Sequence, residues 1–426
     1  MNLAPLAYRL RARTHRAVAG SSRRPRWPVR AVVSVAAAGL VAASGLVSTG
    51  ATTAAAATLP GCQTTAPGQK TLDGVRTASR DVPAAPFGLA YAPSGPTAFV
   101  TLKGDLGVLA TDSFPPRLVR RIPLPVASLG GSGATGLALT HDGRYLLAAT
   151  GSGAIVVDAA KAAAGTAGAV LGTLTGTAGT SAIQVALSPD DRYAFVTQEY
   201  GNSQTGDRGG IEVFDLSKAV TSGFPASAYV GSLTLGKAVV GVAVSPDGRR
   251  VYATSQLAPD GSGPGLLSVA DLATLETAPG RALLGSVPAG CNPVRVAAAP
   301  DGATVWVTAR QSNALLAFDA ARLTADPGNA LLTSVQVGTA PVGLAFTGGG
   351  SRIVTADSNR FAAEGAVTGL TVVDTQAALQ GAKAGLGRIP TGAFPRELAL
   401  SPDGRTLLVS DFGSRQVRAV DVTTLP

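Results

Sequence analysis

The feature that most constrains the fold of this chain is a short pattern that occurs seven times. It consists of an apolar run, a two-residue turn and a second apolar run, as in VGVAVSPDGRRVYAT at 240–254. Asp-Gly between two alternating apolar runs is the strongest short-range signal for a β-hairpin, because tight hairpin turns need positive φ angles. The turn pairs are spaced 48–57 residues apart and are Ser94-Gly95, Asp142-Gly143, Asp190-Asp191, Asp247-Gly248, Asp301-Gly302, Gly349-Gly350 and Asp403-Gly404.

Each hairpin is followed by a third apolar run that ends in aspartate. An aspartate at this place can close the next turn by accepting hydrogen bonds from nearby backbone amides. Turn capping explains these acids better than metal binding does, because they recur at the same place in every unit. They are Asp112, Asp158, Asp215, Asp271, Asp319, Asp374 and Asp421.

A fourth apolar run completes six of the units, at 117–124, 169–175, 228–235, 282–289, 330–337 and 385–391. The seventh unit lacks one, and a matching run at 75–83 precedes the first unit instead. We therefore predict an all-β fold, a seven-bladed β-propeller with four antiparallel strands per blade, whose last blade is completed by the N-terminal strand. Such closure removes exposed strand edges and buries each blade between two neighbours.

Two stretches carry a resemblance to a known family. PVRVAAAPDGATVWVTARQSNALLAFD (293–319) and VVGVAVSPDGRRVYATS (239–255) resemble the YVTN-repeat β-propellers, which are related to the seven-bladed lactonase-like propellers. The resemblance covers about residues 74–426 and implies the propeller fold. It implies little about activity, because the matching residues belong to turns and strands.

The net charge of +9 does not point to nucleic acid. Residues 1–57 hold eight arginines and no acid, and the rest of the chain has 27 basic and 26 acidic residues. A chain this close to neutral has no general attraction for a phosphate backbone. We expect no nucleic-acid partner, and we expect a monomer.

The N-terminus has the organisation of an export signal. The arginine-rich segment is followed by a 17-residue apolar run at 31–47 and by small residues that suit cleavage near Ala56 or Ala57. The expected organisation is an export signal at 1–57, an N-terminal tail at 58–73 and the propeller at 74–426. The protein would be secreted or extracytoplasmic, without a transmembrane span after cleavage. The alternatives are a membrane anchor formed by an uncleaved signal and lipidation of Cys62.

Cys62 and Cys291 are the two cysteines of the chain. An oxidising compartment permits a disulfide between them, and the alternative is two unpaired thiols. Pairing requires the N-terminal tail to cross a wide domain, since the two Cα atoms must approach within ~7 Å.

Three units have longer loops after their second strand, at 198–210, 256–265 and 357–368. In a propeller these loops share one face with the inter-blade loops, and irregular loops on a rigid scaffold commonly carry function. Arginine there can grip a carboxylate or phosphate, and carboxylates and amides can hold a hard cation. The candidate ligand-binding residues are Glu199, Tyr200, Asn202, Asp357, Asn359, Arg360, Glu364, Arg295 and Arg396.

Several kinds of chemistry have no support in the sequence. With His15 and His141 as the only histidines, His-dependent triads and multi-His metal sites are unavailable, and two cysteines exclude a thiolate zinc site. No glycine-rich phosphate loop follows a strand and opens a helix. We expect no metal centre and no cofactor.

Three functional hypotheses remain. The first is a non-catalytic scaffold that binds a ligand or partner through the loop-rich face. The second is a lactonase-like hydrolase that uses a carboxylate such as Glu199 or Glu364, or a bound cation, on the same face. The third is a structural component of the cell envelope.

Overall fold

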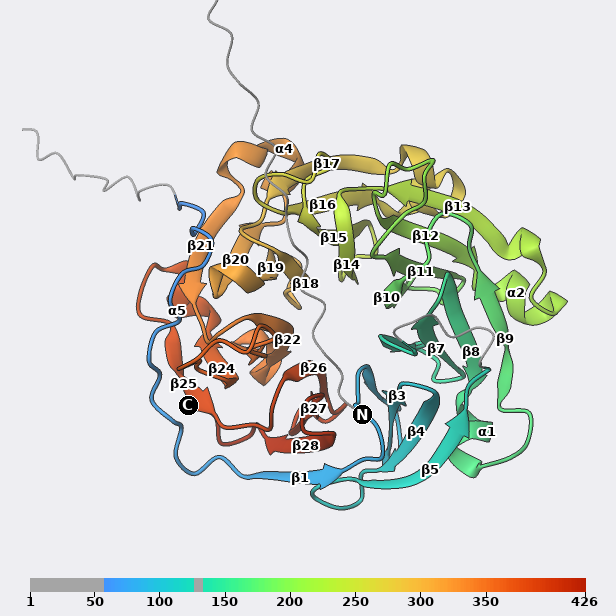
Figure 1. Cartoon of the computed structure of the whole chain (residues 1–426), viewed down its shortest axis with the longest axis horizontal. Helices are drawn as coiled ribbons and strands as arrows, with labels where there is room; N and C mark the ends of the chain where they lie inside the picture. Colours follow the sequence, from blue (N-terminus) through green and yellow to red (C-terminus); the bar gives the residue numbers. More distant parts are fainter. Residues whose placement is uncertain (1–56, 126–132) are drawn as a thin grey trace, which may run out of the picture. The chain divides into compact units, whose positions relative to one another are not determined.

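Twenty-eight strands in the described part of the chain form seven four-stranded antiparallel sheets, arranged as the blades of a ring (Figure 1). The structure is a computed structural model that describes residues 57–125 and 133–426, all within the unit Ala55–Pro426. The predicted seven-bladed β-propeller is confirmed.

The first three blades use β2 to β13 in chain order. Blade one contains β2 (Leu89–Tyr91), β3 (Thr97–Leu102), β4 (Asp105–Ala110) and β5 (Arg117–Pro123). Blade two contains β6 (Leu137–Leu139), β7 (Tyr145–Thr150), β8 (Gly153–Asp158) and β9 (Val170–Thr175). Blade three contains β10 (Ala182–Leu187), β11 (Tyr193–Gln198), β12 (Gly210–Asp215) and β13 (Tyr229–Thr234).

The next three blades repeat this order. Blade four contains β14 (Lys237–Val244), β15 (Arg250–Leu257), β16 (Leu266–Asp271) and β17 (Leu283–Pro288). Blade five contains β18 (Pro293–Ala298), β19 (Thr304–Ala309), β20 (Ala314–Asp319) and β21 (Leu331–Gln336). Blade six contains β22 (Pro341–Thr347), β23 (Arg352–Asp357), β24 (Gly369–Asp374) and β25 (Gly385–Ile389).

The seventh blade joins the two ends of the propeller. It contains β26 (Pro395–Leu400), β27 (Thr406–Asp411), β28 (Gln416–Asp421) and, as its outer strand, β1 (Thr77–Asp81). β1 pairs antiparallel with β28, from Thr77 opposite Val420 to Asp81 opposite Gln416. The N-terminal strand therefore completes the last blade, as the missing fourth run of the seventh unit predicts.

The recurrent hairpin turn is closed by a set of hydrogen bonds from its own side chains, called the lock below. In the fourth unit the Ser245 hydroxyl donates to Asp247 Oδ1 and accepts from the amide of Arg250, and Asp247 also accepts from the amide of Arg249. The hydrogen bond from Ser245 is the main cause that holds the pKa of Asp247 below its usual value. Gly248 supplies the positive φ, 68°, that the turn requires. The same lock occurs at Thr140–Asp142, Ser188–Asp190 and Ser401–Asp403.

The aspartates that end the third strands mostly cap short helices, which the sequence interpretation did not predict. Asp158, Asp215, Asp271 and Asp374 each accept a hydrogen bond from a backbone amide in the first turn of the following helix. The helices are α1 (Ala159–Ala164), α2 (Leu216–Ser222), α3 (Leu272–Thr277), α4 (Arg322–Ala325) and α5 (Thr375–Leu379). Single 3-10 turns lie at Ala226–Ala228, Pro279–Arg281, Arg310–Ser312, Pro327–Asn329 and Gly348–Gly350.

The hydrophobic core is divided among the seven contacts between neighbouring blades. One buried cluster fills each contact, and an eighth cluster lies on the axis. On β19, for example, Val305 and Val307 pack toward blade four, whereas Trp306 packs toward blade six. Because successive side chains of a strand point to opposite faces, each blade is apolar on both sides and needs two neighbours.

Hydroxyl side chains on the second strands add hydrogen bonds between blades. Thr254 donates to the carbonyl of Val294 in blade five, and Thr308 donates to the carbonyl of Val342 in blade six. Thr101 donates in the same way to the carbonyl of Thr135 in blade two. In blades one, four and five the threonine of the repeat is therefore an inter-blade contact.

The N-terminal tail is fixed to the outside of the ring. In Figure 1 it runs past β21, α5 and β25 before it enters β1. Leu72 donates to the carbonyl of Arg388, and Arg388 donates to the carbonyl of Lys70, so this stretch adds a short parallel pairing to blade six.

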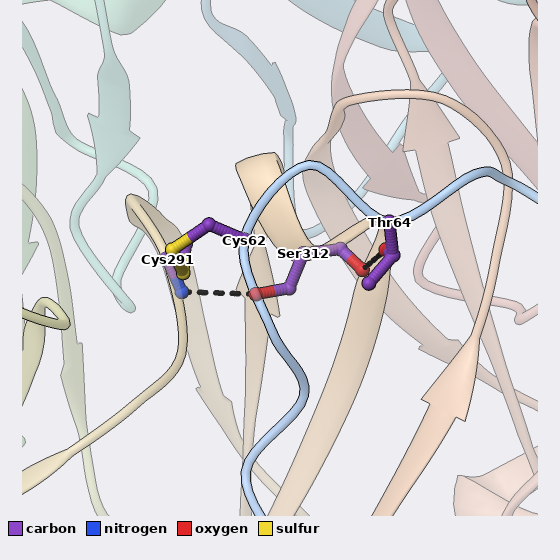
Figure 2. The surroundings of a disulfide bond; sticks show 4 residues. All are labelled: Cys62, Thr64, Cys291 and Ser312. Atoms are coloured by element: carbon purple, nitrogen blue, oxygen red, sulfur yellow. Dashed lines mark hydrogen bonds between the residues drawn. A yellow bond between two sulfur atoms is a disulfide. The ribbon is translucent and has the colours of Figure 1, made fainter.

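A disulfide holds the start of this tail (Figure 2). Cys62 and Cys291 are bonded across 229 residues of sequence, with their Cα atoms 5.4 Å apart. The amide of Cys291 donates to the Ser312 hydroxyl at 3.0 Å, and the Thr64 hydroxyl donates to the carbonyl of Ser312. The disulfide thus attaches the tail to the loop between β17 and β18, and the hydrogen bond from Thr64 attaches it to the loop after β19.

Two expectations from the sequence concern export and membrane crossing. The expected export signal at 1–57 lies, apart from its last residue, outside the described residues. None of the helices in the described part of the chain is both long enough and apolar enough to cross a membrane.

We predict that replacing both cysteines, Cys62→Ser with Cys291→Ser, lowers the free energy of unfolding by about 2–5 kcal/mol, because the bond restricts a very long loop of the unfolded chain. Thermal unfolding with and without a reductant measures the effect. The reductant should lower the Tm of the wild type and leave the Tm of the double variant unchanged. Equal Tm values for oxidised wild type and double variant would contradict the prediction.

Candidate functional site

A cavity of about 220 Å³ lies on the axis of the propeller. Its floor receives one residue from the start of each blade, at the same place in every unit, so the cavity belongs to no single blade. These residues are Phe87, Thr135, Ile183, Val240, Val294, Val342 and Arg396. Six of the seven side chains are uncharged, and blade seven alone places a cation in this ring.

The walls of the cavity come from the loops that follow the second strands. Glu199, Gln256 and Arg360 belong to the three enlarged loops, one residue from each. Arg310 and Phe412 come from the short loops of blades five and seven. The three enlarged loops therefore reach one shared site.

Arg295 also lines the cavity but is largely neutralised. It forms an ion pair with Glu397, and its Nε lies 3.2 Å from the carboxylate of Glu397. Its Nη1 donates to the carbonyl of Val240 at 2.7 Å. This pair joins blades five and seven through the axis and holds Arg295 in place.

Arg310 is buried, with 5% of its surface exposed. Its Nη2 donates to Gln256 Oε1 at 2.8 Å, while its Nε has no hydrogen-bond partner among the described residues. Burial and, to a smaller extent, the positive charge of Arg360 lower the pKa of Arg310 to about 10, against the opposing effect of Glu199. A guanidinium remains charged at neutral pH under these conditions.

Arg396 lies against aromatic rings. Its guanidinium carbon is 3.6 Å from the centre of the Phe87 ring and 5.5 Å from those of Phe394 and Phe412. Its Nε is buried without a hydrogen-bond partner among the described residues. Burial lowers the pKa of Arg396 to about 9, although the nearby carboxylate of Glu397 opposes this effect. The rings stabilise the cation but leave its Nε donor unused.

The cavity is therefore positive. Arg295, Arg310, Arg360 and Arg396 line it, whereas the opposing carboxylates are Glu199 in the lining and Glu397 beside Arg295. The mutual repulsion of the arginines appears in the lowered pKa of Arg310 and of Arg396. A bound anion would relieve this repulsion and occupy the unused donors.

The structure brings together four of the nine residues predicted from the sequence. Glu199, Arg295, Arg360 and Arg396 line the cavity. Tyr200 is exposed at its rim, where the charges of Glu199, Arg360 and Arg310 all act on its hydroxyl.

The other four predicted residues do not line the cavity. Asn202 accepts hydrogen bonds from the amides of Gln204 and Thr205 and so shapes its own loop. Asn359 accepts a hydrogen bond from the amide of Ala363 and donates one to its carbonyl, and so shapes its loop in the same way. Glu364 is exposed on the same loop. The fourth, Asp357, is buried.

Asp357 belongs to a set of carboxylates that hold the inter-blade loops. It accepts hydrogen bonds from the hydroxyls of Thr355 and Thr371, and burial raises its pKa to about 7 against the effect of these bonds. Glu212 accepts from the amide of Ala178 and from Gln198 Nε2, and burial likewise raises its pKa to about 7. Both side chains are thus part of the scaffold.

Sequence reasoning missed Arg310, Gln256, Phe87 and Phe412. Aligning the units would have indicated three of them, because Glu199, Gln256, Arg310 and Phe412 all stand two residues after the hydroxyl position of the second strand, as in VTAR at 307–310. A search restricted to the long loops misses Arg310 and Phe412, because their loops are short. Phe87 becomes visible only through the ring formed by the first strands.

Larger hollows lie away from the axis. One of them, of about 330 Å³ between blades two and three, has no charged residue in its lining. Two others carry charged residues. One, of about 570 Å³, is lined by residues of blades one and seven and has Asp112 and Asp403 as its charged residues. The other, of about 500 Å³, lies between the N-terminal tail and blades five and six, with Lys70 and Lys383. Each of these two holds one pair of like charges, whereas four arginines line the axial cavity. Within residues 57–125 and 133–426 no cluster of three His, Cys, Asp or Glu side chains is arranged to hold a metal ion.

Comparisons with known proteins agree with the fold. No protein-family model matches the chain, and no curated protein matches it. Among solved structures, hydrazine synthase of Kuenenia stuttgartiensis is similar with a TM-score of 0.62 and 18% identity, covering 83% of this chain and 99% of that chain. A chain of a mitotic checkpoint complex is similar with a TM-score of 0.61 and 15% identity, covering 84% and 97%. Similarity at this level of identity shows the fold alone.

The buried carboxylates predict how stability depends on pH. Folding raises the pKa of Asp357 and of Glu212 to about 7, so the folded state favours their protonated forms. Their contribution is favourable at low pH and is lost as the pH rises from about 4 to about 7. We expect the Tm of the wild type to fall by a few degrees between pH 5 and pH 8. Asp357→Asn and Glu212→Gln should each make this fall smaller.

The control for this experiment is Asp73→Asn, which changes an exposed carboxylate of the tail. Thermal unfolding at pH 5, 6, 7 and 8 gives the profile of each variant. A profile for Asp357→Asn that is parallel to the wild-type profile would show that Asp357 titrates normally.

Proposed function

We propose that this protein binds a small organic anion in its axial cavity and acts as a non-catalytic binding scaffold. The observation that carries the proposal is the convergence of Arg295, Arg310, Arg360 and Arg396 on one cavity at the end of the propeller that bears the enlarged loops. Arginine is the side chain best suited to carboxylate and phosphate, because its planar fork offers paired donors.

The unused donors strengthen the proposal. Buried polar atoms in native proteins are nearly always hydrogen-bonded, so each exception calls for an explanation. Arg310 and Arg396 both have a buried Nε without a partner in the described part of the chain. A ligand carboxylate or phosphate supplies the missing acceptors and compensates the cost of burying these charges.

The hydrolase hypothesis receives no comparable support. It requires acids or amides that converge around a substrate or a cation, and Asp357, Asn359 and Glu364 do not line the cavity. Glu199 is the single carboxylate in the lining. A lone carboxylate beside several arginines is suited to a role as their structural counter-ion.

We predict that acetate and inorganic phosphate raise the Tm of the protein, and that Arg360→Gln weakens their binding about tenfold or more, because a charge-assisted hydrogen bond is lost. Arg360 is exposed, so its replacement should leave folding intact. Titration of each anion, followed by thermal shift and by calorimetry, gives the affinities.

Arg405→Gln is the matched control. Arg405 is exposed beside the Asp403-Gly404 turn, and such turns lie at the opposite end of the second strand from the loops that line the cavity. This variant should bind both anions as the wild type does. If neither anion binds, or if Arg360→Gln and the wild type have equal affinities, the axial site is not an anion site.

We also infer that the protein is exported and belongs with the YVTN-repeat propellers. The disulfide between Cys62 and Cys291 supports export, because such bonds persist mainly in oxidising compartments. The hairpin locks and the threonines between blades give the repeat residues a structural role, which is consistent with membership of a repeat family rather than with a shared active site.

Export predicts that the protein recovered outside the cytoplasm begins close to residue 58. Intact-mass measurement on protein from culture supernatant and from cell-envelope fractions checks this. Full-length protein confined to the cytoplasm would contradict export, and uncleaved protein in the membrane fraction would favour the anchored alternative.

A further inference from the structure

The rim of the axial cavity carries two exposed aromatic side chains. Phe361 and Tyr200 have 55% and 51% of their surface exposed, the highest values among the exposed large hydrophobic side chains of the described residues. Both belong to enlarged loops whose neighbouring residues, Arg360 and Glu199, line the cavity.

Both aromatic residues interact with Arg310, Phe361 by direct contact and Tyr200 through electrostatics. The Phe361 ring lies over the guanidinium of Arg310, with the guanidinium carbon 5.2 Å from the ring centre. The Tyr200 hydroxyl is close enough to Arg310 and Arg360 for their charges to act on it, and it interacts with the Glu199 carboxylate. One aromatic ring thus lies over Arg310, and the hydroxyl of a second aromatic residue is within range of its charge.

Exposed aromatic rings beside a charged pocket need an explanation. Burying a ring of this size against an apolar partner is favourable by roughly 25 cal/mol for each Å² removed from water, yet the structure leaves both rings half open. Large exposed apolar groups next to a concave polar site mark places where a ligand completes the contact.

The interior of the cavity is apolar as well as charged. Ile183, Val240, Val294 and Val342 form the floor beside Phe87, and together they belong to the axial cluster. A ligand that is only a charged group would leave this surface uncovered. The volume of about 220 Å³ is below the range of typical drug-sized pockets, so the ligand must be small.

We propose that the ligand is a small arylcarboxylate, an anion whose aromatic ring packs against Phe361 and Tyr200 while its carboxylate meets Arg310, Arg360 and Arg396. This inference rests on the proposed anion site and specifies its ligand class. The arginines supply recognition of the charge, and the rim and floor supply recognition of the ring.

The test compares acetate with phenylacetate, which adds only the ring. In the wild type, phenylacetate should bind at least tenfold more tightly than acetate, and the neutral phenylacetamide should bind at least tenfold more weakly than phenylacetate. Phe361→Ala and Tyr200→Ala should each remove much of the advantage of phenylacetate and change the acetate affinity less than twofold. Dissociation constants come from calorimetry, or from ligand NMR where binding is weak.

Leu284→Ala is the matched control, because Leu284 is an exposed hydrophobic residue of β17, an outer strand of blade four. It should leave all three affinities unchanged. Equal binding of acetate and phenylacetate, or an unchanged preference in both aromatic variants, would overturn the arylcarboxylate assignment and leave the anion site intact. Failure of all the anions to bind would overturn both.

Discussion

Pairing of β1 with β28 is the contact on which the rest of the structure depends. A single blade is apolar on both faces and cannot exist in water by itself, so each blade is stable only between two others. Seven buried clusters, one at each contact between neighbouring blades, satisfy this requirement. The ring closes only because the segment before blade one supplies the outer strand of blade seven. The disulfide and the bonds around Arg388 then attach the chain that precedes this strand.

Closure creates the axial cavity and also limits what can fill it. The first strands of neighbouring blades approach so closely that a Cβ at Gly343 would lie 2.3 Å from the carbonyl oxygen of Arg396, and one at Gly241 would lie 2.5 Å from that of Val294. Most units therefore have glycine at this position, and the residue before it points to the axis. Arginine at one of the seven equivalent axial positions, Arg396, adds its charge to those of the arginines from the neighbouring loops and strands.

Charge in this protein serves two separate purposes. Glu212 and Asp357 are buried with hydrogen bonds from the inter-blade loops and from neighbouring strands, and they hold the scaffold at the end where the loops lie. Arg310 and Arg396 keep unused donors and face the cavity. The loop of Arg310 is itself supported by the tail, because the amide of Gln63 donates to the carbonyl of Gln311 and the Thr64 hydroxyl donates to that of Ser312, beside the disulfide. The stability of the rim and the geometry of the site are thereby connected.

The sequence by itself determined the number of blades, the strands and their closure, because hairpin turns and alternating apolar runs depend on neighbouring residues and leave a local record. It also indicated the face of the site and four of its residues, Glu199, Arg295, Arg360 and Arg396. Only the tertiary structure decided that Asp357 is a buried support, that Arg310 and Phe361 belong to the site, and that Cys62 reaches Cys291. These depend on which residues of different blades meet at the axis and rim. These contacts are set by the closure of a ring over hundreds of residues, so no local sequence pattern encodes them.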